Sequence, residues 1–467
     1  MPKSIDTYPI IKWLVFGIVA ISIAAVPISP VLLGEFSTHT DYLRLGDLWL
    51  LAAFVPVAAA AYFFLGKYLA AKSQRFTLVS ISLLSIVLYL LVLFNCYYVT
   101  YGDFGFIRDA AWKMAAGEYD ARQFADSDYM RMYNWQTGMA VLQSVFMRIF
   151  DIYYVYVIKA FNCVCQLCTT LMRYFLAKRH FGKEVATFAA LAAAIHVPYI
   201  LSIAELSNQQ TTAPLLLLSL YLYEGKHRFY AGVCAGVANV MRPIGIIILL
   251  SVLCYEIFLW LRKYEKWQHI KRFATFAIGM YVVLFIADAI AIGVNYADSP
   301  LSSANLPYYK FHSGFTGYIN PSDDIARMGG IDNFNEWEKQ QISNALTKDF
   351  TTTAAYVGKK MIFYLGFVDD HFIDTFGRDF SIIFSPGIRV WYLLGWAQYI
   401  VLLCIAMYAI VRRRAIHIPL FAIFFIGNTL VYVFIEACTS YRFPHYLYLF
   451  ILAAQAFALP KDQQVER

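Results

Sequence analysis

Asp103 is the first charged residue after a long apolar run, and several more charged residues follow it closely. A carboxylate in this place is suited to remove a proton from an acceptor hydroxyl, provided that the two groups lie within hydrogen-bond distance. Asp109 follows six residues later, which on a helix turns its side chain about 240° away from Asp103. The two aspartates are therefore rival candidates for a general base. Each is weighed against the simpler interpretation of a surface charge on a solvated helix.

Arg242 stands before Pro243 between two short apolar runs, in the segment ANVMRPIGIIILL. A proline ends a helix, so we expect the chain to turn here at a membrane border. A guanidinium in that place can hold a phosphate through two parallel hydrogen bonds. The alternative is an arginine that only extends toward lipid headgroups.

Glu436, Arg442 and His445 are clustered around Pro444 at the start of the last apolar run. Ionisable residues at membrane depth are costly, which makes them functional candidates. We expect Glu436 to form an ion pair with Arg442. Arg442 and His445 would then neutralise a phosphate that gains charge as a bond to it breaks. Glu205 is a further carboxylate at a border, and the alternative for all of these residues is a purely structural role.

The composition restricts the class of protein. Hydrophobic residues make up 60% of the chain and charged residues only 15%, which is unlike ordinary soluble domains. We therefore expect an all-α polytopic membrane protein. The net charge of +7 is modest, and in such a protein it reports orientation in the membrane. No nucleic acid partner is expected.

A hydrocarbon core of about 30 Å needs about 20 apolar residues per helix, and the hydropathy pattern predicts about 12 transmembrane helices. The predicted intervals are 10–33, 48–66, 76–98, 154–177, 185–203, 210–224, 229–241, 244–262, 272–294, 389–411, 416–434 and 443–459.

The basic flanks of these intervals predict the topology. If both termini are cytoplasmic, every short, strongly basic connection is cytoplasmic as well. Two long segments, 99–153 and 295–388, are then outside. The first is expected to contain helices lying along the membrane interface, and the second to be a large outer loop that becomes helical only from about residue 335. The chain is thus divided into a core (1–294), the outer loop (295–388) and C-terminal helices (389–467).

The order of these elements resembles that of the polytopic, lipid-phosphosugar-dependent glycosyltransferases of the GT-C superfamily. The likeness is to the branch of the protein mannosyltransferases and the aminoarabinose transferase of lipid A, including Gram-positive bacterial members. It rests on four places. The first is an aspartate at the head of an outer helix, followed by YNWQTGMAVLQ, and the others are VIKAFNCVCQLCTTLMRYFLAKRHFGK, GVCAGVANVMRPIG and EACTSYRFPHYLYLFILAA.

The resemblance implies an inverting hexosyl- or pentosyltransferase. Its donor would be a sugar on polyprenyl phosphate, and its acceptor a glycan, teichoic acid, glycolipid or protein at the outer face of the plasma membrane. Asp103 would be the base, and Arg242, Arg442 and His445 would hold the phosphate, with Glu436, Asp109 and Glu205 as further candidates. The protein would contact membrane lipid throughout.

Two other functions stay open at this point. A flippase or transporter for lipid-linked glycans would use the same basic residues, although the internal repeats of many transporters are not evident. A glycan polymerase or ligase would also use a large outer loop. No local spacing of metal ligands and no phosphate-binding glycine loop is found. No cofactor is therefore expected, and a divalent metal is left open.

Overall fold

The computed structural model describes residues 9–36, 48–95, 102–261, 266–317, 320–369, 388–413 and 419–458. These residues form helices and turns, and none of them forms a strand. The prediction of an all-α chain is therefore confirmed for the described residues.

Each of the twelve predicted intervals contains a helix. These helices are α1 (Pro9–Ala25), α3 (Leu48–Ala71), α4 (Gln74–Asn95), α8 (Tyr154–Phe181), α9 (Lys183–Ala194) with α10 (Val197–Leu201), α11 (Gln209–Glu224), α12 (Arg228–Met241), α13 (Gly245–Leu261), α14 (Lys266–Gly293), α20 (Ile388–Arg413), α21 (Pro419–Phe434) and α22 (Phe443–Ala454). Apolar runs of this length fold as helices because a helix satisfies its own backbone hydrogen bonds in lipid.

Not all of these helices are long enough to cross a bilayer alone. The described residues contain five helical stretches of sufficient length and apolarity, which are Trp49–Ala71, Gln74–Asn95, Asn134–Phe181, Trp267–Gly293 and Arg389–Val411. Helix α9 and the residues Val197–Ala204 form a sixth if the pair, bent by 57°, is counted as one span. Four shorter apolar helices are Pro9–Ala25, Gly245–Leu261, Pro419–Phe434 and Phe443–Phe457. The count of twelve spans stays a prediction.

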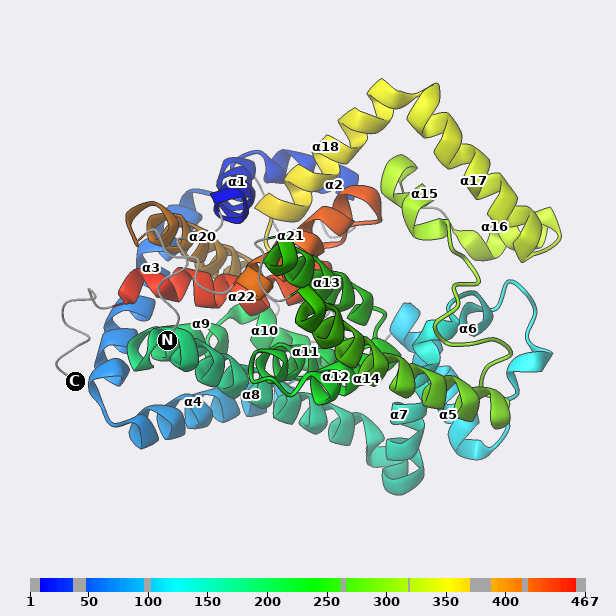
Figure 1. The fold of residues 1–467 in the computed structure, drawn as a ribbon, viewed down its shortest axis with the longest axis horizontal. Helices are drawn as coiled ribbons and strands as arrows, with labels where there is room; N and C mark the ends of the chain where they lie inside the picture. Colours follow the sequence, from blue (N-terminus) through cyan, green and yellow to red (C-terminus); the bar gives the residue numbers. More distant parts are fainter. Residues whose placement is uncertain are drawn as a thin grey trace.

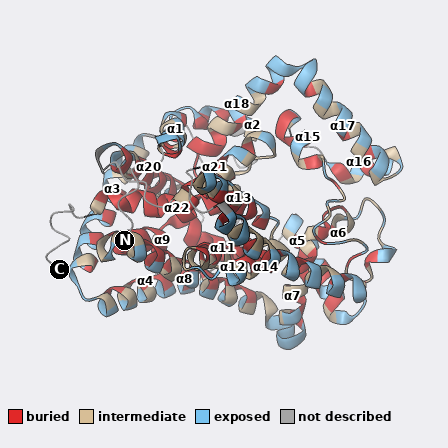
Figure 2. Ribbon diagram, viewed as in Figure 1, coloured by how far each residue is buried: buried red, intermediate tan, exposed pale blue. Residues whose placement is uncertain are grey.

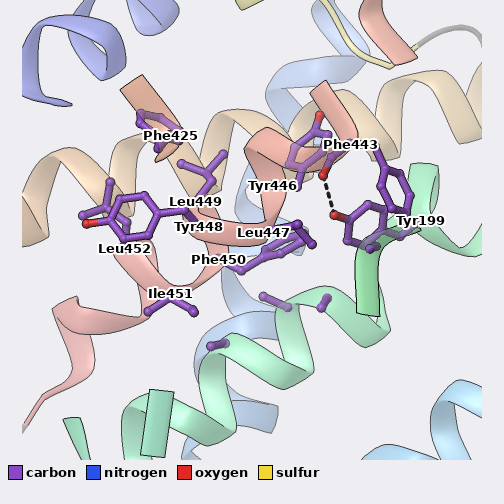
Figure 3. Packing of buried hydrophobic residues seen from close by; sticks show 14 of the residues in the cluster. Tyr199, Phe425, Phe443, Tyr446, Leu447, Tyr448, Leu449, Phe450, Ile451 and Leu452 are labelled. Carbon is purple, nitrogen blue, oxygen red and sulfur yellow. Dashed lines mark hydrogen bonds between the residues drawn. The ribbon is translucent and has the colours of Figure 1, made fainter. Parts of the chain in front are cut away.

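Helix α22 lies in the centre of the bundle, and all of its residues are buried. Figures 1 and 2 show it surrounded by α9, α11, α20 and α21, with the buried residues gathered along this axis. The Tyr199 hydroxyl donates a hydrogen bond of 2.8 Å to the carbonyl of Phe443, at the first residue of α22 (Figure 3). This bond fixes the start of α22 against α10.

Helices α12 and α14 run parallel and approach each other closely at glycines. A Cβ at Gly232 would lie 2.0 Å from the carbonyl oxygen of Phe276, and one at Gly236 would lie 2.8 Å from that of Met280. Only a residue without a side chain permits this approach. The two helices are therefore tightly packed along α12, and Arg242 directly follows the end of α12.

The two segments predicted to lie outside contain short helices. The first holds α5 (Asp103–Ala116), α6 (Tyr129–Met132) and α7 (Thr137–Phe150). The second holds α15 (Tyr309–Thr316), α16 (Pro321–Met328), α17 (Ile331–Thr347) and α18 (Phe350–Gly366), which extend beyond the bundle in Figure 1. The second segment is thus helical from Tyr309, earlier than the expected start near residue 335. Its prolines and glycines mark helix ends, since Pro321 starts α16 and Gly317 and Gly329 directly follow helices.

These two segments pack against each other. Met132 and Tyr133 share a buried apolar cluster with Leu306, Tyr309, Ile325 and Phe334. Polar contacts reinforce it, because Nδ2 of Asn134 donates to the carbonyl of Pro300 over 2.8 Å. Both segments therefore form one unit at one end of the bundle.

Candidate active site

Helix α5 begins at Asp103, and the turn before it depends on a glycine. Gly102 has φ of 61°, a conformation that costs little only for glycine. The turn places Asp103 in the first helical turn, where the helix dipole stabilises a carboxylate. Asp103 is exposed, so a second molecule can reach it.

Three tyrosines form an aromatic group, and two of them, Tyr129 and Tyr133, lie near this carboxylate. The rings of Tyr129 and Tyr133 are 4.8 Å apart, and that of Tyr309 is 5.8 Å from Tyr133. Burial raises the pKa of the Tyr129 and Tyr133 phenols, and the charge of Asp103 adds to both shifts. Burial also raises the pKa of Tyr309. All three phenols therefore stay protonated at neutral pH and can donate hydrogen bonds.

Lys310 and Glu436 form an ion pair in the same region. The backbone N–H of Glu436 also donates to the carbonyl of Lys310 over 2.9 Å. Burial by itself would lower the pKa of Lys310, but the charge of Glu436, with a contribution from Asp103, holds it above its usual value. Lys310 is thus a permanent cation at neutral pH, within electrostatic range of Asp103.

Arg242 contributes a second cation, and both this residue and Lys310 lie next to the ring of Tyr441. The guanidinium carbon of Arg242 lies 5.4 Å from the ring centroid of Tyr441, and Nζ of Lys310 lies 5.9 Å from it. Asn208 accepts a hydrogen bond of 3.2 Å from Arg242, and its amide donates to the carbonyl of Met241 over 3.0 Å. Arg242 is therefore oriented by Asn208. We call Asp103, Tyr129, Tyr133, Tyr309, Lys310, Glu436, Tyr441 and Arg242 the acid–cation cluster.

A narrow slot adjoins the acid–cation cluster and continues into the helix bundle. Its wall is mostly apolar, and Arg242 is the one charged residue among those that line it. The others are Gln209, Thr212, Ala213, Leu216, Ile244, Phe443, Pro444 and Leu447. This combination of an apolar wall and one cation suits the head end of a lipid phosphate in its chemistry, and the slot, with a volume of about 10 Å³, would have to widen to admit a chain.

Arg442 and His445 lie inside the helix packing instead. Both are fully buried, and the guanidinium carbon of Arg442 lies 4.7 Å from the ring centroid of Tyr399. The expected ion pair between Glu436 and Arg442 is wrong, because Glu436 pairs with Lys310. The physical reason is the helix start at Phe443, which turns Arg442 into the bundle while Glu436 stays at the end where α15 packs.

Asp109 and Glu205 have other surroundings. Asp109 pairs with the neighbouring Arg108 at 2.7 Å, and 62% of its side chain is exposed. Glu205 is buried, and its carbonyl accepts a hydrogen bond of 2.8 Å from Asn162 of α8. The helix therefore separates the two aspartates, as their spacing predicted.

Lys360 of α18 ties the elements that carry Lys310 and Glu436 together. Its buried Nζ donates to the carbonyl oxygens of Gly314 at 2.6 Å, Ile435 at 2.9 Å and Val433 at 3.2 Å. These bonds join α15 to the end of α21. Lys360 thereby fixes the position of the ion pair without reaching the cluster itself.

Sequence reasoning missed Lys310, Tyr441 and Lys360. The segment LPYYKFHSG, which contains Lys310, lies in a region expected to be loop. Lys360 stands at the edge of an apolar helical stretch, and a charge in such a place is a usable signal. Tyr441 differs from the many other tyrosines of the chain only in its surroundings.

Among the described residues, no group of three His, Cys, Asp or Glu side chains is arranged to hold a metal ion.

Comparison with known proteins gives a family for part of the chain. Residues 138–290, which include Arg242, match the family model of the dolichyl-phosphate-mannose-protein mannosyltransferases. Over this segment, about a third of the chain, the match confirms the resemblance to membrane glycosyltransferases of the GT-C superfamily that the sequence predicted. The search of curated proteins found no match.

Two solved structures are similar to this chain at low identity. The structure of ArnT from Cupriavidus metallidurans bound to undecaprenyl phosphate has a TM-score of 0.42 and 13% identity, covering 82% of this chain and 77% of that chain. The apo structure of the same protein has a TM-score of 0.37 and 14% identity, covering 81% and 77%.

Proposed function

We propose that this glycosyltransferase moves a sugar from a polyprenyl phosphate donor to a hydroxyl of a cell-surface acceptor, with inversion at the anomeric carbon. The acceptor is a glycan, teichoic acid, glycolipid or protein at the outer face of the membrane. The observation that carries the proposal is the acid–cation cluster, in which an accessible carboxylate lies near two oriented cations beside an apolar slot. The family description, with its lipid phosphate donor, supports it.

The donor occupies the slot and the cluster together. Its lipid chain lies along the apolar wall, and its phosphate binds Arg242 through two parallel hydrogen bonds. Lys310 adds a positive charge that strengthens as the bond to the sugar breaks. Tyr441, next to both cations, shields this region from water.

Asp103 removes the proton from the attacking hydroxyl. The acceptor oxygen forms a bond to the anomeric carbon, and the bond from that carbon to the phosphate oxygen breaks on the opposite face. The electron pair of the broken bond goes to the phosphate, which leaves without needing a proton. One base and a cationic clamp are therefore sufficient.

The test is sugar transfer by purified Asp103→Asn protein with a radiolabelled polyprenyl-phosphate sugar. Asparagine keeps the size but cannot accept the proton, so turnover falls by roughly 10²-fold or more, while donor binding persists. The matched control is Asp109→Asn on the opposite helix face, which should keep near-parental turnover.

The contrary outcomes identify the alternatives. If Asp109→Asn is inactive and Asp103→Asn is not, the base is on the other helix face. If both variants restore surface glycans in a deletion strain and the purified protein transfers no sugar, the transport function is supported. Mass spectrometry of surface polymers from cells with and without the gene identifies the sugar and the acceptor.

A further inference from the structure

A second cavity, lined by several cationic residues, lies at the far end of α12, away from the acid–cation cluster. It is a cleft between the first turns of α12 and α14, and its cationic lining residues are Lys226, Arg228, Lys271 and Arg272. Because α12 runs from this cleft to Arg242, the cleft and the cluster lie at opposite ends of the same helix. The cleft therefore cannot be part of the proposed active site.

The positive charges of this basic cleft are not neutralised within the described part of the chain. None of its four cations forms an ion pair there with a carboxylate. The nearby acidic residues are engaged elsewhere, since Glu224 pairs with His180 at 2.6 Å and Glu256 pairs with His269. Four like charges around one hollow repel each other, and a bound anion relieves that repulsion.

The cleft also lies at the depth of lipid headgroups. Helix α14 contains the candidate span Trp267–Gly293, so its first turns mark a membrane border. Trp267 is 75% exposed and Tyr230, which lines the cleft, is 63% exposed. Large exposed aromatic residues of this kind are typical of membrane–water interfaces.

We propose that the basic cleft binds the phosphate headgroup of an anionic membrane lipid. Arg228 and Arg272 provide planar guanidinium groups for the phosphate oxygens, and Lys226 and Lys271 add charge. The acyl chains follow the apolar surfaces of α12 and α14 into the bilayer. A bound lipid thereby joins the ends of two helices that already pack through glycines.

The proposal is tested on the full-length protein in detergent, by titration with phosphatidylglycerol or phosphatidylcholine and native mass spectrometry of the retained lipid. The double variant K271Q/R272Q should bind phosphatidylglycerol roughly 10- to 30-fold more weakly, at about a factor of five for each charge removed near the surface. The matched control K72Q/R75Q removes two exposed basic residues at the turn between α3 and α4 and should bind as the parent does.

Three outcomes would overturn the proposal. Equal binding of the two lipids by the parental protein contradicts an anionic headgroup site. If K271Q/R272Q and K72Q/R75Q weaken the binding of phosphatidylglycerol equally, the binding is due to general surface charge and not to the basic cleft. Glycerol phosphate that competes as strongly as the intact lipid shows a site for soluble phosphate esters. Because binding is measured without sugar transfer, none of these results depends on the proposed enzymatic function.

Discussion

Lys310 and Glu436 come from helix α15 and from the chain after α21, and their ion pair brings these distant segments together beside Asp103. Both groups are partly exposed, with 35% and 24% of their side chains accessible. An ion pair of this kind contributes little to stability. Its value is therefore in holding the Lys310 ammonium at a fixed position, ready for an anionic ligand.

Two arginines beside prolines have different environments, and this gives a paired prediction. Arg242→Lys should weaken donor binding about 10- to 100-fold, because lysine cannot reproduce two parallel hydrogen bonds to a phosphate. Arg442→Lys should leave donor affinity within about threefold of the parent. It should instead lower the melting temperature, since stacking of a buried guanidinium on an aromatic ring is worth about 2 kcal/mol.

Donor affinity by titration and thermal unfolding in detergent separate the two effects. The reverse pattern, with Arg442→Lys losing the donor and keeping its stability, would return Arg442 to the phosphate site expected from sequence.

Burial lowers the pKa of Lys360 from 10.5 to about 8, and this has a consequence for stability. The unfolded chain keeps the proton up to its ordinary pKa, so folding releases a proton between about pH 8 and 10.5. The contribution of Lys360 to the free energy of unfolding should therefore increase with pH in this window. Melting temperatures of the parent and of Lys360→Met are compared from pH 7.5 to 10.

The difference between the two proteins isolates Lys360 from the tyrosines that titrate in the same range. If the difference in melting temperature between the parent and Lys360→Met does not change with pH, Lys360 has an ordinary pKa in the folded protein.

At the scale of elements, the docking of α15 depends on one glycine. A Cβ at Gly314 would lie 2.4 Å from the carbonyl oxygen of Phe434, so the backbones of α15 and the end of α21 are in direct contact. Gly314→Ala should force them apart at a cost of about 1–3 kcal/mol. Sugar transfer should fall with it, because Lys310 lies one helical turn away.

The control is Gly358→Ala in the interior of α18, where a Cβ would meet nothing within 4 Å. Alanine favours a helix over glycine by about 0.5–1 kcal/mol, so this variant should be as stable as the parent or more. Thermal unfolding and sugar-transfer assays are carried out on both Gly314→Ala and Gly358→Ala. An active, stable Gly314→Ala protein would show that α15 is not held as described.

The helices of the bundle were predictable because each follows from a local apolar run, and Asp103 was predictable because it ends one. The helices α15 and α16 were not, since Pro321 and Gly317 read as turn residues although they only separate short helices. The ion-pair partner of Glu436 also could not be predicted from the sequence. Arg442 is six residues away along the chain, whereas Lys310 is brought close only by the docking of α15.

At the scale of the whole molecule, the packing of the two long segments into one unit leads to a topology prediction. If both lie outside, single cysteines at the exposed positions Gln123 and Gln340 should react with an impermeant thiol reagent in intact cells. A cysteine at Arg75, at the start of α4 beside the short α3–α4 turn, should react only after lysis. Labelling of the parental protein, which has cysteines of its own, gives the background signal to be subtracted. Protection of both outer positions in intact cells would reverse the topology.

The packing of these segments also bears on how the chain is made. Asp103 is synthesised early, whereas Glu436 follows about 330 residues later, which at 5–20 residues per second is roughly 20 to 70 s. Lys310 has its partner, and Lys360 two of its three carbonyl acceptors, only once the last residues of α21 and those directly after it have been delivered. A nascent chain therefore carries the proposed base before Lys310 has its partner, and the proposed mechanism predicts that sugar transfer becomes available only near the end of synthesis rather than growing step by step during translation.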